Sequence, residues 1–136
     1  MKVLVDTCIW SLALRRNTPG TQLAHLEELK ELINEARVQL MGPVRQEILS
    51  GVKSDRQFEQ LKEHLAAFPD IPITTGDFEQ AARYFNLARS KGIQGSNTDF
   101  LICSVATRHN LSIFTVDQDF ELFRTVLPLH LHELRV

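Results

Sequence analysis

Residues 96–120 have the sequence SNTDFLICSVATRHNLSIFTVDQDF, which begins as an amphipathic helix. Ser96 or Asn97 is a suitable N-cap, and Asp99 falls in the first helical turn, where a carboxylate is favoured. Apolar residues then recur at helical spacing: Leu101, Ile102, Val105 and Ala106. This spacing predicts a helix that buries one face.

A short apolar strand is predicted directly after this helix, over 111–116. Asn110 suits the left-handed position at a helix end, so it marks the turn between the two elements. The strand ends at Asp117 and Asp119. In open α/β folds, ligands bind beyond the carboxyl ends of the parallel strands. We therefore expect these acids and Asp99 to meet at one edge of a sheet.

Apolar segments alternate with helical patterns along the rest of the chain. Strands are predicted over 2–5, 38–41, 71–74 and 127–131. Helices are predicted over 9–14, 21–36, 43–51, 54–68, 77–90 and 120–125, with Thr21 as one N-cap. The alternation predicts an α/β fold, a three-layer α/β/α sandwich with a central, mostly parallel sheet. We expect a single domain that spans residues 1–136.

Composition places the chain among globular proteins, with 43% apolar and 24% charged residues in 136. No apolar stretch is long enough for a membrane span, and residues 1–14 make a poor signal peptide, so we expect a cytoplasmic protein. Cys8 and Cys103 are then expected to be reduced. The net charge of -2 argues mildly against a nucleic-acid binder, although acids at a metal site would hide a local basic patch.

Acidic residues recur at predicted element ends. Asp6 follows the first strand, Glu47 and Asp99 lie early in helices, and Asp117 or Asp119 follows a later strand. Taken alone, Asp99 is explained by a helix dipole and Asp117 by a turn. Asp6 is harder to explain in this way, because an Asp directly after a buried strand usually has a partner or a ligand. Gathered at one sheet edge, however, they would raise one another's pKa and destabilise the fold unless a divalent cation were bound. Carboxylates without a nearby Cys/His set suit Mg²⁺ or Mn²⁺.

Four motifs carry a resemblance to a known family, in the order VDTCIW, VRQEILSG, SNTDFLICSVA and FTVDQDFELF. The order and spacing of the four motifs cover essentially the whole chain, which resembles a PIN-domain ribonuclease of the VapC type, the toxin half of a toxin–antitoxin pair. The resemblance implies a Mg²⁺-dependent endoribonuclease with catalytic Asp6, Glu47, Asp99 and Asp117. Asp6, Asp99, Asp117 and Asp119 are the candidate metal ligands. Asp117 is preferred over Asp119 because it follows the strand directly.

The resemblance also implies partners and supporting residues. The expected substrate is RNA, such as tRNA, and the expected partners are a cognate antitoxin and a second copy of the chain. The supporting hydroxyl and amide groups are expected to hold carboxylates or metal-bound water: Thr7, Ser96, Asn97 and Thr98. Simple helix capping is an equal alternative for these four residues.

Two other functions remain open from the sequence. An aspartyl-phosphate enzyme would use Asp6 as its nucleophile, but such phosphatases of the haloacid-dehalogenase type expect a second Asp where Cys8 stands. A non-catalytic binding module on the same fold would be favoured by the loss of an acid, and none is lost.

Arginine, lysine and histidine side chains are weaker candidates for RNA contacts or metal binding. Arg15, Arg16, Lys53 and Arg56 are predicted either to contact RNA phosphates from loops beside the acids or to be simply solvated. His130 and His132 would share one face of the last strand. An exposed polar face is favoured over a metal pair there, because no third ligand is nearby.

Overall fold

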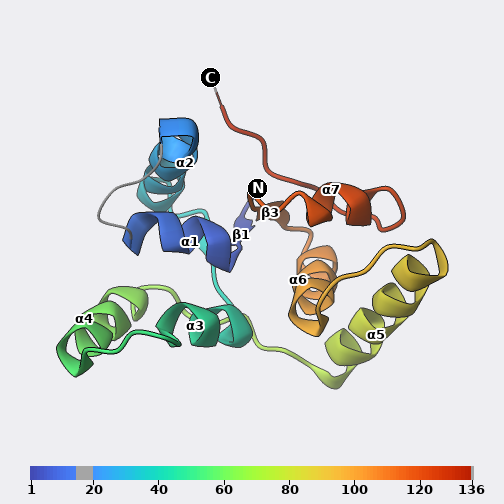
Figure 1. The fold of residues 1–136 in the computed structure, drawn as a ribbon, viewed down its shortest axis with the longest axis horizontal. Coiled ribbons are helices and arrows are strands. Elements are labelled where there is room, and N and C mark those ends of the chain that lie inside the picture. The colour runs from blue at the N-terminus through green and yellow to red at the C-terminus, as the bar shows by residue number, and fades with distance from the viewer. Residues whose placement is uncertain (15–19, 136) are drawn as a thin grey trace.

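A computed structural model describes residues 1–14 and 20–135, and a small parallel sheet lies at its centre (Figure 1). Its strands are β1 (Val3–Val5), β2 (Val38–Gln39) and β3 (Ser112–Phe114), in the order β2-β1-β3. Every residue of β1 and β3 is buried, and β1, the central strand, is entirely apolar, as is typical of a parallel strand covered on both faces. The predicted α/β fold with a parallel sheet is confirmed.

The register of the sheet decides which residues meet at its carboxyl edge. Val3 lies opposite Val38 on one side and Ser112 on the other, and Val5 lies opposite Phe114. The ladder continues one step further, because the Asp6 backbone N–H donates to the Phe114 carbonyl at 2.9 Å. Asp6 is therefore held at the edge where β1 and β3 both end.

Helices surround the sheet, with α1 and α2 on one side and α5 and α6 on the other (Figure 1). The bounds are α1 (Thr7–Leu14), a 3-10 turn (Gly20–Gln22), α2 (Leu23–Asn34), α3 (Gly42–Leu49), α4 (Asp55–Leu65), α5 (Thr75–Ser90), α6 (Asn97–Arg108) and α7 (Asp119–Arg124). Within the described ranges, no helix combines the length and apolar character needed to cross a bilayer.

Helix α6 is the most buried helix, and residues 100–106 are all inaccessible or nearly so. Its start is fixed by a reciprocal cap in which Ser96 Oγ accepts from the Asp99 backbone N–H, and Asp99 accepts from that of Ser96. Asn110 has a φ of 54°, so the predicted left-handed turn after the helix is confirmed.

Two predicted strands and one predicted cap are wrong. Segment 71–74 forms no strand, and the single bridge nearby joins Leu40 to Asp70, the residue before it. Segment 127–131 pairs with the sheet only through one bridge, between Ile113 and Leu131. Pro72 and Pro128 lack the N–H that a continuous ladder needs. Thr21 does not cap α2: a 3-10 turn precedes that helix, and its N-cap makes no side-chain hydrogen bond.

Residues 131–135, which we call the C-terminal tail, are tied to α2 by a buried acid. Glu28 is 6% exposed and accepts hydrogen bonds from Arg135 at 2.9 Å, while His132 Nε2 lies 2.7 Å from its carboxylate. The His132 side chain is 9% exposed, so the predicted exposed polar face is wrong for this residue. The hydrogen bonds from Arg135 lower the pKa of Glu28 to about 2, against the effect of burial.

This tether gives a stability prediction. Glu28→Gln should lower the free energy of unfolding near neutral pH by roughly 2 kcal/mol, because a carboxylate with a depressed pKa favours the folded state in its charged form. The difference from wild type should be complete above the unfolded value of 4.5 and should fade as the pH falls toward about 2. Urea unfolding at several pH values measures it.

The neighbouring Glu27→Gln is the matched control. Glu27 pairs with Lys30 at 3.4 Å on the exposed side of α2, and such pairs contribute little. Equal losses of stability in the two variants, or a Glu28→Gln effect that does not depend on pH, would contradict the proposed tether.

Candidate active site

Asp6 is a nearly buried carboxylate whose oxygens are both hydrogen-bonded. It is 7% exposed; the Thr7 backbone N–H donates to Oδ1 at 2.8 Å, and the Thr115 hydroxyl donates to Oδ2 at 2.9 Å. Burial raises the pKa of Asp6, these hydrogen bonds oppose the rise, and the negative charge of Asp117 adds to it. The net effect is a raised pKa, so the surroundings of Asp6 disfavour the charged form of its carboxylate.

Asp99 reaches the same region from the start of α6. Burial raises its pKa, its bonds with Ser96 lower it, and the charges of Asp6 and Asp117 raise it further. Asp99 thus completes the helix cap and also lies within electrostatic reach of the two other acids. The helix-capping role considered for this residue from sequence is confirmed.

Asp117 joins these acids from the turn after β3. Its backbone N–H donates to Thr115 Oγ1 at 3.0 Å, so one hydroxyl links it to Asp6. Its own carboxylate accepts from the Asp119 backbone N–H at 2.9 Å, at the start of α7. Asp119 is exposed, and no hydrogen bond or ion pair involves its carboxylate within the part of the chain that the structure describes. The geometry places Asp117, rather than Asp119, beside Asp6.

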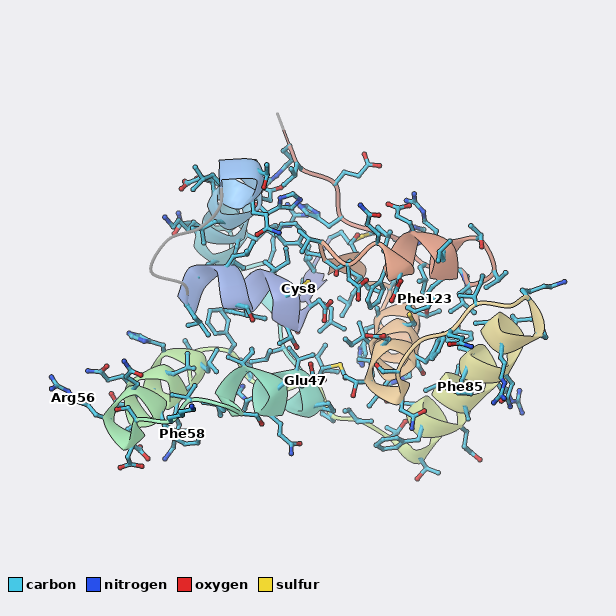
Figure 2. All side chains as sticks on the ribbon, viewed as in Figure 1. Cys8, Glu47, Arg56, Phe58, Phe85 and Phe123 are labelled. Carbon is cyan, nitrogen blue, oxygen red and sulfur yellow. The ribbon has the colours of Figure 1, made fainter. Side chains whose placement is uncertain are left out.

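Glu47 comes from α3, on the opposite side of the start of α1. It is exposed, and its Oε2 accepts from the Thr7 hydroxyl at 2.9 Å. Figure 2 shows Glu47 just below Cys8, which lies in the first turn of α1. Gly42 and Pro43 begin α3 and set this position, since proline is well suited to the first turn of a helix. Glu47 is therefore linked to the three aspartates through the Asp6–Thr7 dipeptide.

The predicted supporting residues divide into two groups. Thr7 and Ser96 hydrogen-bond to acids of the site. Asn97 and Thr98 instead line a separate cavity of about 390 Å³, whose other walls are mostly apolar: Pro43, Phe78, Ala81, Ala82 and Leu101.

Of the four predicted basic residues, the structure describes Lys53 and Arg56, and neither forms an ion pair with an acid of the site within the described ranges. Figure 2 shows Arg56 at the outer end of α4, away from Glu47. Lys53 is exposed in the segment before α4. Arg15 and Arg16 lie outside the described residues.

Sequence reasoning missed Thr115 and the role of Cys8. Burial raises the pKa of Cys8 to about 11, so its thiol stays protonated and lies 3.4 Å from Asp6 Oδ2 as a donor. It also lies 3.3 Å from the Thr115 hydroxyl. The signal for Thr115 was the strand register, because pairing the first strand with segment 111–116 sets residues 6 and 115 side by side.

The oxygen donors of the site are of the kind that a metal ion such as Mg²⁺ prefers. Among residues 1–14 and 20–135, no three His, Cys, Asp or Glu side chains are drawn together closely enough to form a metal site. The chemistry of the set nevertheless fits a hard cation. Its members are carboxylates and hydroxyls. The charge of Asp117 adds to the raised pKa of Asp6, and the charges of Asp6 and Asp117 add to that of Asp99, a repulsion that a bound cation relieves.

The Thr115 bridge gives a prediction about charge. Thr115→Val should raise the pKa of Asp6 further, because the hydroxyl stabilises the charged form of the carboxylate. Titration of the carboxyl carbons by NMR measures this change. Thr125→Val is the control, since among the described residues the Thr125 hydroxyl bonds to the Leu122 carbonyl and to no carboxylate. An unchanged Asp6 titration in Thr115→Val would show that the hydrogen bond does not support the charge.

Comparison with known proteins identifies relatives of this chain. The PIN domain model matches residues 3–125. Ribonuclease VapC11 of Mycobacterium tuberculosis is 29% identical over 137 residues, which cover 98% of this chain and 99% of the relative. The VapC ribonuclease Mb1587 of Mycobacterium bovis matches with the same identity and the same coverage.

Solved structures share the fold over nearly the whole chain. The crystal structure of FitAcB from Neisseria gonorrhoeae superposes with a TM-score of 0.77 at 20% identity, covering 96% of both chains. VapBC2 from Rickettsia felis, solved with a DNA fragment from its promoter, gives 0.76 at 20% identity, covering 97% of this chain and 98% of that one. Because the family model spans all three strands and the residues that place the aspartates, the chain belongs to the PIN domain family.

Proposed function

We propose that the protein is a metal-dependent endoribonuclease that acts as the toxin of a toxin–antitoxin pair. The observation that carries the proposal is the cluster of Asp6, Asp99 and Asp117, whose mutual repulsion contributes to the raised pKa values of Asp6 and Asp99. Within the described ranges, no Lys or Arg forms an ion pair with any of the three. Relatives with 29% identity are named ribonucleases, which supports RNA as the substrate.

The three aspartates would hold Mg²⁺ or Mn²⁺. When bound, such an ion supplies the positive charge that polarises the phosphodiester and lowers the pKa of water. Thr115 fixes the orientation of Asp6 and the backbone at Asp117. These two carboxylates would therefore keep their positions when a metal ion binds or leaves. Glu47 is exposed and held by a single hydroxyl, so it can accept the proton of the attacking water.

The competing phosphatase chemistry fits the geometry less well. An aspartyl-phosphate enzyme needs a carboxylate oxygen that is free to attack phosphorus. Both oxygens of Asp6 accept hydrogen bonds, and the residue is only 7% exposed. Asp6 is therefore better suited to hold a cation than to act as a nucleophile.

The proposed partners are an RNA such as tRNA, a cognate antitoxin and a second copy of the chain, in the cytoplasm. Support for the antitoxin comes from solved structures of the same fold. One of these is a toxin-antitoxin complex from Klebsiella pneumoniae, which superposes with a TM-score of 0.64 at 22% identity, covering 88% of this chain and 90% of that one. An antitoxin that covers the aspartates would hold the nuclease inactive.

The function is tested with Asp99→Asn. The wild type should cleave labelled RNA with Mg²⁺ or Mn²⁺ and not with EDTA, and the variant should lose cleavage by orders of magnitude because metal binding weakens. The amide oxygen of the variant can still accept from the Ser96 backbone, so the helix cap remains. Without metal, the loss of one repelling charge should leave the fold as stable or slightly more stable. Mg²⁺ should then raise the melting temperature of the wild type more than that of the variant.

Asp55→Asn is the matched control, because Asp55 also lies in the first turn of a helix, α4, but away from the site. It should retain cleavage and the full thermal response to Mg²⁺. An Asp99→Asn protein that is destabilised in EDTA, yet cuts RNA at the wild-type rate, would overturn the proposed site.

A homodimer is proposed because α5 exposes apolar side chains. Phe78 is 56% exposed beside the mostly apolar cavity, and Leu87 is 42% exposed on the same helix. Sedimentation at micromolar concentration should give a dimer, and Phe78→Asp should give a monomer. Leu122→Asp on α7, where Leu122 is 52% exposed, is the control and should stay dimeric. A monomeric wild type would contradict the proposal.

A further inference from the structure

A cavity of about 430 Å³ opens directly beside the aspartates. Thr115 and Asp117 form part of its lining, so it is continuous with the candidate active site. Its other walls come from the start of α2, from α7 and from the C-terminal tail, which Figure 1 shows running back from α7 toward α2. Its volume suits one small-molecule-sized group.

Charge around this cavity argues against a phosphate as its occupant. Asp117, Glu121 and Glu133 all line it. Arg124 lines it too, but its guanidinium is already paired with Glu121 on α7. An anion would therefore face more negative charge than free positive charge. A neutral group with hydrogen-bonding edges suits the cavity better.

Two polar atoms in the cavity wall have no hydrogen-bond partner among the described residues. Gln22 Oε1 and His25 Nδ1 are buried, and neither atom makes a hydrogen bond within the part of the chain that the structure describes. Buried polar atoms without a partner are uncommon, because each loses its bonds to water without a replacement. Both residues line the cavity, so a group bound there lies next to two side chains with an unsatisfied polar atom.

Aromatic rings hold the same wall in place. The His25 ring stacks on Phe114 of β3 with ring centres 6.1 Å apart and an angle of 23° between the planes. His132 packs edge-on against the same ring at 5.3 Å and is fixed by Glu28. Proteins recognise unpaired RNA bases with flat side chains and with hydrogen-bonding groups of this type.

We infer that this cavity receives one unpaired nucleobase of the RNA, next to the bond cut at the aspartates. The inference rests on the proposed ribonuclease function and adds a substrate class to it. Gln22 and His25 bind the edge of the base, and the wall around Phe114 holds His25 in place. A base inside a duplex cannot enter, so the substrate is a single-stranded loop or end.

The test maps cleavage of a randomised single-stranded RNA library by sequencing the cut ends. The wild type should prefer one base by about tenfold at one position beside the cut, and the double variant Gln22→Ala, His25→Ala should lose most of that preference. Cleavage of a duplex of the preferred sequence should be at least tenfold slower. Gln60→Ala, His64→Ala is the matched control, since both residues are exposed on α4, and it should keep the preference.

Binding in EDTA separates this inference from the nuclease proposal. Fluorescence anisotropy with four labelled single-stranded oligonucleotides, each built from one base, needs no metal and no cleavage, and the double variant should bind the best of them about tenfold more weakly than wild type does. Gln22→Glu, which keeps the shape but removes the amide donor, should change which base is preferred. Melting temperatures verify that each variant is folded.

Three results would overturn the inference. The first is an unchanged base preference in the folded double variant. The second is equal cleavage of duplex and single strand. The third is a loss of antitoxin binding by the double variant while its RNA selection stays intact, which would assign the cavity to a peptide. If no RNA is cut but the base-dependent binding in EDTA is lost in the variant, the cavity is supported and the nuclease proposal fails.

Discussion

The pairing of β1 with β3 is the constraint on which the candidate site depends. Val5 lies opposite Phe114, and the Asp6 backbone extends that ladder by one hydrogen bond. Asp6 and Thr115 are therefore adjacent, and the Thr115 hydroxyl also holds the backbone at Asp117. A shift of one residue in this register would turn Thr115 to the other face of the sheet and separate the two acids. The positions of Asp6 and Asp117 are thus set by the pairing of two buried strands.

Helix α6 shows how stability and function share one residue. Asp99 closes the reciprocal cap with Ser96 at the helix start. The same carboxylate faces Asp6 and Asp117, whose charges raise its pKa. The helix that carries it is buried along most of its length, so the carboxylate cannot move away from its neighbours without disturbing the core. The helix cap therefore holds the Asp99 carboxylate near Asp6 and Asp117, although their charges repel it.

Much of this arrangement could be predicted from sequence, because it depends on local patterns. Hydrophobic spacing predicted α6, and an acid after a buried strand predicted the location of Asp6. The predictions that were wrong depended on non-local packing. Alternating apolar residues at 127–131 suggested a strand, but the position of Pro128 and the turn at Leu129 leave only one bridge. The burial of His132 was not predictable, because its partner Glu28 is 104 residues away.

These long separations bear on how the molecule folds. The hydrogen bond from Thr115 to Asp6 spans 109 residues, and those from Arg135 to Glu28 span 107. Bringing such distant segments together costs loop entropy before any contact offsets it, which slows folding. The helices between them can form from local contacts, whereas the aspartate cluster and the neighbouring cavity need both ends of the described chain. A partly folded chain would contain most of the helices and none of the completed site.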